Sequence, residues 1–398
     1  MDAKSLVRLA EATISTDELR ILADWLVEDP QLTKGPLTLE FENRFAKAVG
    51  STHAVFVNSG SSANLLVASA ALQSGRLRNN RVLCPAVSWV TSVTPFFQLG
   101  FDVELVDADR YNLGLDIVDL EQKIVDFDPA ALLLVHVLGH PNHMDQILAL
   151  CEKYNLMLIE DTCEALGTTT PNGQWLGTLG AAGTFSFYYG HHISTIEGGM
   201  VVTDDEDLYQ LMLSIRSHGW SRDLSPEARG RLQDAWNIDN FSNLYTFYHD
   251  GFNLRPTDLQ AKLGLSQLEK LDAIRFARQR NFDIYGNLLK NFWAQESHST
   301  VLSSFAYGTF VENRDELAAR LQESGIECRP LLCGNLGRHP FWLKKKPPFA
   351  GEVADLVHNF GIYFPNHAML QDHQIERLCG IVSEVGVPVF PAPRQPSL

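Results

Sequence analysis

Closely spaced cysteines are absent from this sequence. Its six cysteines stand at positions 84, 151, 163, 328, 333 and 379, and no two of them form a CxxC pair. This spacing predicts neither a disulfide framework nor a zinc or iron–sulfur site. We therefore expect reduced thiols and no metal cluster.

The sequence also lacks long apolar runs and an excess of positive charge. No uninterrupted apolar stretch approaches the ~20 residues that span a bilayer, and the N-terminal segment has no apolar signal-peptide core. The chain carries 48 acidic against 32 basic side chains, a formal net charge of -16. Nucleic acids and anionic membranes bind positive surfaces, so we expect neither partner and a cytoplasmic protein.

What the sequence does contain is a regular alternation of strand and helix patterns. Its 398 residues, 45% of them hydrophobic, are enough for two domains. From about residue 37 short apolar strands alternate with amphipathic helices, and the run from Ala131 to Val137 is typical of a strand covered on both faces. This order predicts a mainly parallel sheet with helices on both sides and ligand sites beyond the carboxyl ends of its strands.

The pattern changes after about residue 265. A long charged helix is predicted from Gln267 to Leu289, followed by short strands and a helix from Arg314 to Ser324. We therefore expect a large α/β domain over residues 1–265, which begins with a helical arm at residues 1–30, and a smaller α+β domain over residues 266–398.

A small polar turn follows one of the predicted strands. In the segment Asn58-Ser-Gly-Ser-Ser-Ala-Asn64, Gly60 allows a tight turn, while Ser61 and Ser62 can cap the next helix and leave amide N–H groups free. A helix N-terminus of this kind can bind a phosphate. An ordinary helix cap would have the same sequence.

Two further polar segments stand at strand ends. Ile159-Glu-Asp-Thr-Cys-Glu164 offers a carboxylate that could bind a metal, act as a base or pair with a protonated ring nitrogen. The segment from Thr184 to Gly199 includes His191 and His192 and ends in two glycines. Neighbouring histidines rarely chelate one ion and no HExxH pattern is present, so a catalytic base is the more economical role for one of them.

The order and spacing of these three segments resemble the sugar aminotransferases of the DegT/DnrJ/EryC1/StrS group. The resemblance runs from about residue 20 to residue 390 and implies the aspartate-aminotransferase fold (fold type I). It also implies a pyridoxal 5'-phosphate or pyridoxamine 5'-phosphate cofactor. The residues that match the cofactor motifs of the group are Gly60, Ser61, Ser62, Asp161, Glu164 and Ser186.

One position departs from the pattern of the group. His191 stands where the group carries the lysine that forms an imine with the cofactor, and no lysine occurs between Lys153 and Lys262. Imidazole can move protons but cannot form that imine, so an internal aldimine from this region is excluded.

A branch of the same group shows this replacement, namely the 3-dehydratases that make 3,6-dideoxysugars. The matching segments are Pro85–Trp89, Gly139–Asn142, His218–Trp220, Asn253–Pro256 and Gly325–Pro330. The cysteine spacing favours the cluster-free type, which acts on GDP-linked 4-keto-6-deoxymannose and takes its amino group from L-glutamate. The resemblance then implies that His191 removes a proton from the cofactor methylene and protonates the departing C3 hydroxyl.

The resemblance assigns further roles by position. Trp89 would stack on the cofactor ring, and Asn253 would reach the cofactor phosphate of a neighbouring subunit, so we expect a homodimer with active sites at the subunit interface. Candidates for the substrate diphosphate or the glutamate carboxylate are the side chains of His218, Arg222, Arg255 and Arg329.

Three other interpretations fit parts of the sequence. The chain could be an ordinary sugar aminotransferase that works without the lysine, or a non-catalytic relative that binds a sugar nucleotide. His136, His140 and His143 have the spacing of a metal triad, which would suit a zinc hydrolase. We expect no metal, because the group needs none at this loop.

Overall fold

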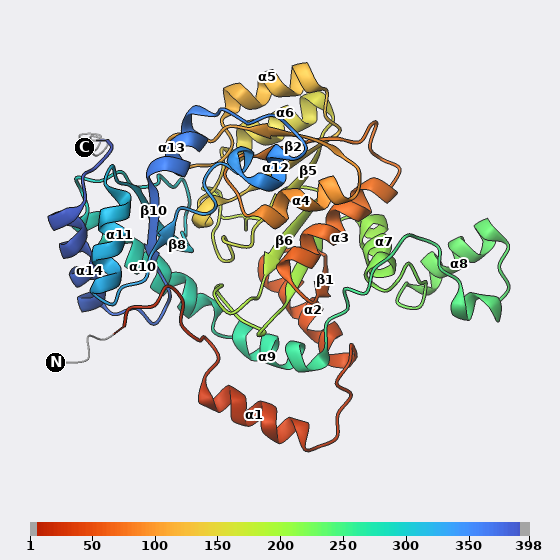
Figure 1. Cartoon of the computed structure of the whole chain (residues 1–398). Coiled ribbons are helices and arrows are strands. Elements are labelled where there is room, and N and C mark those ends of the chain that lie inside the picture. Colours follow the sequence, from red (N-terminus) through yellow and green to blue (C-terminus); the bar gives the residue numbers. More distant parts are fainter. Residues whose placement is uncertain (1–5, 391–398) are drawn as a thin grey trace.

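The strands of the large domain form one twisted sheet with helices on both faces, as a computed structural model describing residues 6–390 shows (Figure 1). Within these residues the sheet has the strand order β1-β7-β6-β5-β4-β2-β3. Strands β2 to β6 pair in parallel, whereas β7 and β1 add an antiparallel edge. The strands are β1 (His53–Val57), β2 (Arg81–Pro85), β3 (Asp102–Val106), β4 (Ala131–Val135), β5 (Met157–Asp161), β6 (Ala182–Ser186) and β7 (Gly199–Thr203).

Alternating side chains of the strands pack against two helical layers. Val55, Leu133 and Val201 belong to the core beneath α3, α4 and α7, whereas Phe56 and Leu134 face α2, α5 and α6. This period of two is what a sheet covered on both faces requires. The covering helices are α2 (Pro36–Val49), α3 (Gly60–Gln73), α4 (Val90–Gln98), α5 (Ile117–Phe127), α6 (Met144–Tyr154) and α7 (Glu206–Arg216).

A second hydrophobic core holds the smaller C-terminal part together. Its antiparallel strands have the order β8-β10-β9, and Tyr307, Phe364 and Leu378 are buried between them and the helices. The elements are β8 (Ala306–Phe310), β9 (Arg329–Pro330), β10 (Gly361–Pro365), α10 (Leu271–Leu288), α11 (Arg314–Glu323), α12 (Pro340–Leu343), α13 (Glu352–Phe360) and α14 (Asp372–Val385).

Two helices lie outside the layers described above, although Ala228 of the second one still packs into the core of the large sheet. Helix α1 (Thr16–Leu26) begins with a capping box of Ser15 and Glu18 and runs beside α9 (Asp258–Leu268). Helix α8 (Pro226–Trp236) projects from the body on an arm that follows α7 (Figure 1). The short 3-10 turns are η1 (Val137–Gly139), η2 (Ser242–Tyr245) and η3 (Leu336–Arg338).

The structure confirms the predicted fold class, and it differs from the prediction in detail. The strand expected to reach Val137 ends at Val135, because Leu138 and Gly139 have positive φ values in the turn η1. The long helix expected from Gln267 to Leu289 is present as α10 (Leu271–Leu288), but it begins four residues later, because α9 ends at Leu268. The predicted boundary at residue 265 therefore falls inside α9.

The structure describes no membrane-spanning element. Within residues 6–390, no helix combines the length and the apolar character that a bilayer crossing requires.

Candidate active site

The carboxyl ends of neighbouring parallel strands meet at one edge of the large sheet. Asp161 is the last residue of β5, where it is in register with Val135 of β4 and Thr184 of β6. Ser186 ends β6, so the polar groups of two sequence motifs lie at the same edge. This is the edge at which open α/β sheets bind their ligands.

Three neutral donors hold the buried carboxylate of Asp161. Its Oδ2 accepts hydrogen bonds from Asn64 Nδ2 at 2.9 Å and Ser92 Oγ at 2.6 Å, and its Oδ1 accepts the backbone N–H of Cys163 at 3.0 Å. Thr184 Oγ1 in turn donates to Asn64 Oδ1 at 2.7 Å. A buried carboxylate held only by neutral groups is suited to pair with a cationic ligand atom, such as a protonated pyridine nitrogen.

The turn before α3 packs directly on Ser186. Ser59 caps the helix by accepting the N–H of Ser62 at 3.0 Å. A Cβ atom on Gly60 would lie 2.6 Å from the Cβ of Ser186, and one on Gly199 would lie 2.3 Å from the carbonyl oxygen of Ser59. The glycines are therefore required by close approach, and the helix N-terminus and the Ser186 hydroxyl line the same cup.

His191 lies over this edge with a defined ring orientation. Its Nδ1 is 2.8 Å from the carbonyl oxygen of Cys163. Because a carbonyl only accepts, Nδ1 carries the proton and Nε2 keeps a free lone pair. Burial lowers the pKa of His191 to about 4, although part of the ring stays accessible, and the hydrogen bond to Cys163 opposes that decrease. The ring is thus a neutral base at pH 7.

Glu164 carries the opposite perturbation. Burial raises its pKa to about 8, and the neighbouring Asp161 charge adds to the increase, while the N–H of Leu138, which donates to Oε2 at 2.8 Å, opposes it. The site therefore holds one protonated carboxylic acid and one neutral imidazole at pH 7, next to the carboxyl group of Asp161.

Two predicted residues lie at the rim of the site. Trp89 precedes the first turn of α4, where Ser92 binds Asp161, and its side chain is 56% exposed. Arg329 lies on β9 opposite Tyr363 of β10. Burial raises the pKa of Tyr363, the charge of Glu164 raises it further and the charge of Arg329 lowers it, so Tyr363 lies near both side chains. The side chains of Trp89 and Arg329 are free to contact a ligand.

Four predicted residues have no contact with His191 or Asp161 in the described structure, although the segment of Asn253 and Arg255 runs beside the turn before α3, where the carbonyl of Leu254 accepts the N–H of Asn58 at 3.1 Å. Asn253 is exposed and accepts a hydrogen bond from Arg255 Nε at 3.1 Å, and Arg222 stacks on the ring of Trp220. His218 borders a hollow with the C-terminal half of α3, at the opposite end from Gly60. The structure does not bring these side chains to His191 within one chain.

The supporting polar residues around Asp161 were not predicted from the sequence. Asn64 stands in the quoted turn segment but was given no role, and neither Ser92 nor Thr184 was singled out. An available signal was Asn64 itself, a polar residue on a helix that is otherwise buried and apolar. Such a residue needs a hydrogen-bonding partner in the core.

The histidines with metal-like spacing have protein partners. His136 Nε2 lies 3.1 Å from Glu160 Oε2 in the core, and His140 Nδ1 lies 3.1 Å from the carbonyl oxygen of Glu296. His143 faces Asp109 at 3.6 Å. Within residues 6–390, no three His, Cys, Asp or Glu side chains are grouped so that they could hold a metal ion.

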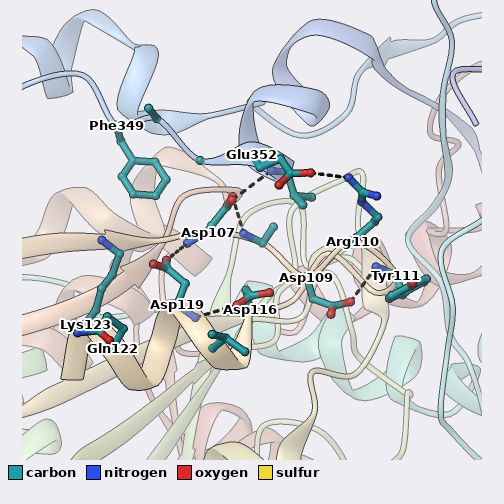
Figure 2. Close-up of a pocket in the computed structure, with 15 residues that line it drawn as sticks. Asp107, Asp109, Arg110, Tyr111, Asp116, Asp119, Gln122, Lys123, Phe349 and Glu352 are labelled. Carbon is teal, nitrogen blue, oxygen red and sulfur yellow. Dashed lines mark hydrogen bonds and ion pairs between the residues drawn. The ribbon is translucent and has the colours of Figure 1, made fainter. Parts of the chain in front are cut away.

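A hollow of about 750 Å³ lies apart from the strand-end cluster and shares no residue with it (Figure 2). Its carboxylates are already engaged, since Asp107 accepts the N–H groups of Val353 and Ala354 at the start of α13. Asp119 accepts the N–H of Asp107, and Arg110 pairs with Glu352. The lining therefore joins the two parts of the chain.

The chain is similar to known proteins over nearly its whole length. The model of the DegT/DnrJ/EryC1/StrS aminotransferase family matches residues 14–383. A GDP-4-keto-6-deoxy-D-mannose 3-dehydratase of Yersinia pseudotuberculosis is 35% identical over 389 residues, which cover 94% of this chain and 98% of the relative.

Two solved structures of GDP-4-keto-6-deoxymannose-3-dehydratase have the same fold. One, with a trapped PLP-glutamate geminal diamine, has a TM-score of 0.86 and 32% identity and covers 94% of this chain and 99% of its own. The other, a mutant with bound GDP-perosamine, has a TM-score of 0.87 and 32% identity and covers 94% of this chain and 100% of its own.

Proposed function

The chain belongs to the DegT/DnrJ/EryC1/StrS aminotransferase family, and on that basis we propose that it is a 3-dehydratase of a nucleotide-linked 4-keto-6-deoxyhexose. The substrate is a GDP-linked sugar, in keeping with the relatives named above. The working cofactor is pyridoxamine 5'-phosphate, which is formed in the site from pyridoxal 5'-phosphate and L-glutamate.

The observation that carries the proposal is the imidazole of His191. Its Nδ1–H donates to the Cys163 carbonyl, so its free Nε2 can accept a proton at pH 7. A lysine at this position would bind the cofactor covalently and favour transamination, whereas an imidazole can only move protons. The replacement therefore favours elimination of a hydroxyl group over transfer of an amine.

The residues at the sheet edge fit the cofactor. The N–H groups of Gly60 and Ser61 and the adjacent Ser186 hydroxyl are suited to a phosphate, while Ser62 closes the turn by donating its N–H to Ser59 and its hydroxyl to Asn58. Asp161 keeps a pyridine nitrogen protonated, and Trp89 covers the ring. When bound, the cofactor supplies an amine that condenses with the C4 ketone and a ring that accepts electrons.

His191 moves the proton in this scheme. Its Nε2 takes a proton from the methylene carbon and returns it to the oxygen that leaves C3. Glu164, protonated at pH 7, would offer an O–H donor to a bound ligand beside Asp161. Hydrolysis then yields ammonia and a 4-keto-3-deoxysugar.

A homodimer completes the site. Asn253, His218 and Arg222 lie on the surface that leads to the projecting arm, and there they reach the site of a second subunit. The arm exposes apolar side chains that a partner would cover, with exposed fractions of 67% for Trp236, 83% for Phe241 and 77% for Tyr245. Arg255 and Arg329 bind the substrate diphosphate or the glutamate carboxylate.

Product analysis tests the proposal. The protein is incubated with pyridoxal 5'-phosphate, L-glutamate and a panel of nucleotide-linked 4-keto-6-deoxyhexoses, and the sugars are examined by mass spectrometry. Loss of one oxygen with release of ammonia is the expected result. Replacement of the ketone by an amine would make the protein an aminotransferase instead, and unchanged sugars with cofactor still bound would favour a binding protein.

His191→Asn is the matching variant. An amide cannot accept the proton, so we expect the rate to fall by at least ~100-fold while the cofactor still binds. His143→Asn, which changes a histidine that faces Asp109 and contacts none of the site residues named above, is the control and is expected to keep the wild-type rate. Equal rates for wild type and His191→Asn would contradict the assigned role.

A further inference from the structure

Arg278 is a buried cation without an acidic partner. It lies on α10, and within residues 6–390 no carboxylate pairs with its guanidinium. Burial lowers its pKa to about 9, which leaves the group protonated at pH 7. A buried charge is strongly unfavourable unless hydrogen bonds replace its water, so its position calls for a reason.

Backbone carbonyls replace that water. Nη1 donates to the carbonyl oxygens of Ser304 at 3.3 Å, Phe305 at 2.9 Å and Asn366 at 2.7 Å. Asn366 returns the contact, since its Nδ2 donates to the carbonyl oxygens of Arg278 and Ser304. The guanidinium thus fixes two segments of the smaller domain, at residues 303–305 and at Asn366.

The same side chain also contacts the candidate active site at the carboxyl ends of β5 and β6. Nη2 of Arg278 donates to the carbonyl oxygen of His191 at 3.4 Å. The ring of Phe305 contacts the His191 ring at a centroid distance of 5.2 Å and lies 5.9 Å from the Arg278 guanidinium carbon. His191 and Arg278 are therefore joined directly and through one shared aromatic ring.

The charges around His191 oppose one another. Burial has the largest effect on the pKa of the imidazole and lowers it. The positive charge of Arg278 lowers this pKa further, whereas the negative charge of Asp161 raises it. Tyr188 and His192 also face the ring. His192 carries no charge at pH 7, because burial holds its pKa well below the usual value. His367 is the remaining titratable group beside Arg278.

We propose that Arg278 is a positioning residue for His191: it holds the backbone of that residue against the smaller domain, and its unpaired charge adds to burial in opposing protonation of the imidazole. The inference rests on the proposed function for its catalytic meaning. It adds a residue that touches neither cofactor nor sugar and acts only through His191.

Without the guanidinium, Asp161 would be the remaining full charge that acts on the ring among the described residues. The pKa of His191 would then rise, so the protonated imidazole, which cannot take a proton, would form at a higher pH on the acid side of the rate profile. A like charge in the near surroundings shifts a pKa by about one unit, which is the change we expect on its removal.

Imidazole NMR tests the inference independently of turnover. The His191 ring signal of the cofactor-loaded protein is assigned with His191→Asn and titrated in wild type, Arg278→Met and Arg278→Lys. We expect a pKa below ~6.5 in wild type, a value about one unit higher in Arg278→Met, and a nearly unchanged value in Arg278→Lys. The acid limb of the rate profile is expected to move with the NMR value.

Arg275→Met is the matched control. Arg275 lies one turn earlier on α10, is buried against Trp175 and is not bonded to His191, so its loss is expected to leave the His191 pKa unchanged. Arg278→Gln replaces Arg278→Met if the latter does not fold. A wild-type pKa at or above the usual value, or an equal pKa in wild type and the neutral variants, would overturn the inference. A shifted pKa in a protein that converts no sugar would contradict the proposed function alone.

Discussion

Glu164 and His191 lie within one site, yet burial changes their protonation in opposite senses. The carboxyl pKa rises to about 8 and the imidazole pKa falls to about 4, so both groups are neutral at pH 7. Burial disfavours whichever form carries a charge, which explains both directions.

Glu164→Gln tests the protonated carboxylic acid. A glutamine reproduces its neutral form and still accepts the N–H of Leu138, so we expect activity at pH 7 within about threefold of wild type. Wild type is expected to lose activity above about pH 8, as the acid ionises beside Asp161. The pH dependence of the rate of both proteins is the measurement.

Glu164→Leu serves as the control, since it leaves the N–H of Leu138 without an acceptor and should reduce stability. An alkaline limb that is identical in wild type and Glu164→Gln would show that Glu164 does not titrate in that range.

Among single residues, the sequence pointed to the residues of the cofactor motifs, but it did not point to the residues that hydrogen-bond to them. Gly60, Asp161, Ser186 and His191 were found because their order and spacing resemble a family. Asn64, which holds Asp161, and Arg278, which contacts His191, come from helices whose pairing depends on tertiary packing. No local pattern encodes a hydrogen bond between residues 97 positions apart.

The elements follow from local sequence more closely than the site does. Strand β4 begins at the predicted residue, Ala131, and ends two residues before the predicted end, because a buried apolar run of this length is a strong signal. The break between α9 and α10 contains no glycine or proline from which it could have been predicted. There Lys270 bonds Glu18 of α1, a contact that only the folded chain provides.

Gly60→Ala tests the contact between α3 and β6. The added Cβ would lie 2.6 Å from Ser186 Cβ and 3.2 Å from its Cα, so the helix N-terminus must move away from the strand. We expect cofactor affinity to fall at least tenfold and stability to fall by about 1–3 kcal/mol, as for other overpacked sites. Fluorescence titration with pyridoxal 5'-phosphate and urea unfolding give the two numbers.

Gly230→Ala is the matched control within α8, where an added Cβ meets nothing within 4 Å. Alanine there is expected to raise helix stability by roughly 0.5–1 kcal/mol without changing cofactor affinity. Equal affinity of Gly60→Ala and wild type would contradict the assignment of the turn to the phosphate.

For the whole molecule, buried neutral histidines govern stability at mildly acidic pH. Burial lowers the pKa of His140 to about 3 and that of His367 to about 4, and His192 shifts in the same direction. Between pH 6.5 and 4 the unfolded chain therefore binds protons that the folded chain does not, so stability falls as the pH falls. Glu164 has the opposite sign but is a single group, and its contribution is lost as the pH rises through about 8.

Urea unfolding at pH 7, 6 and 5 measures this dependence. Each buried histidine is expected to remove about 1.4 kcal/mol per pH unit in the lower part of the window. His140→Phe removes one such group, whose ring already packs against Phe282, and should give a shallower dependence. A free energy of unfolding that does not change between pH 7 and 5 would contradict the expectation.

The arm that carries α8 has a consequence for how the protein is made. A newly folded chain exposes 55% of Phe247, 58% of Leu244 and the larger aromatic surfaces around them until another surface covers them. Exposed apolar patches are also where unpaired chains aggregate. For the proposed homodimer, the yield of native protein recovered from denaturant is therefore expected to pass through a maximum as the protein concentration increases. Low concentrations slow the pairing of folded chains, and high concentrations favour aggregation of unfolded ones.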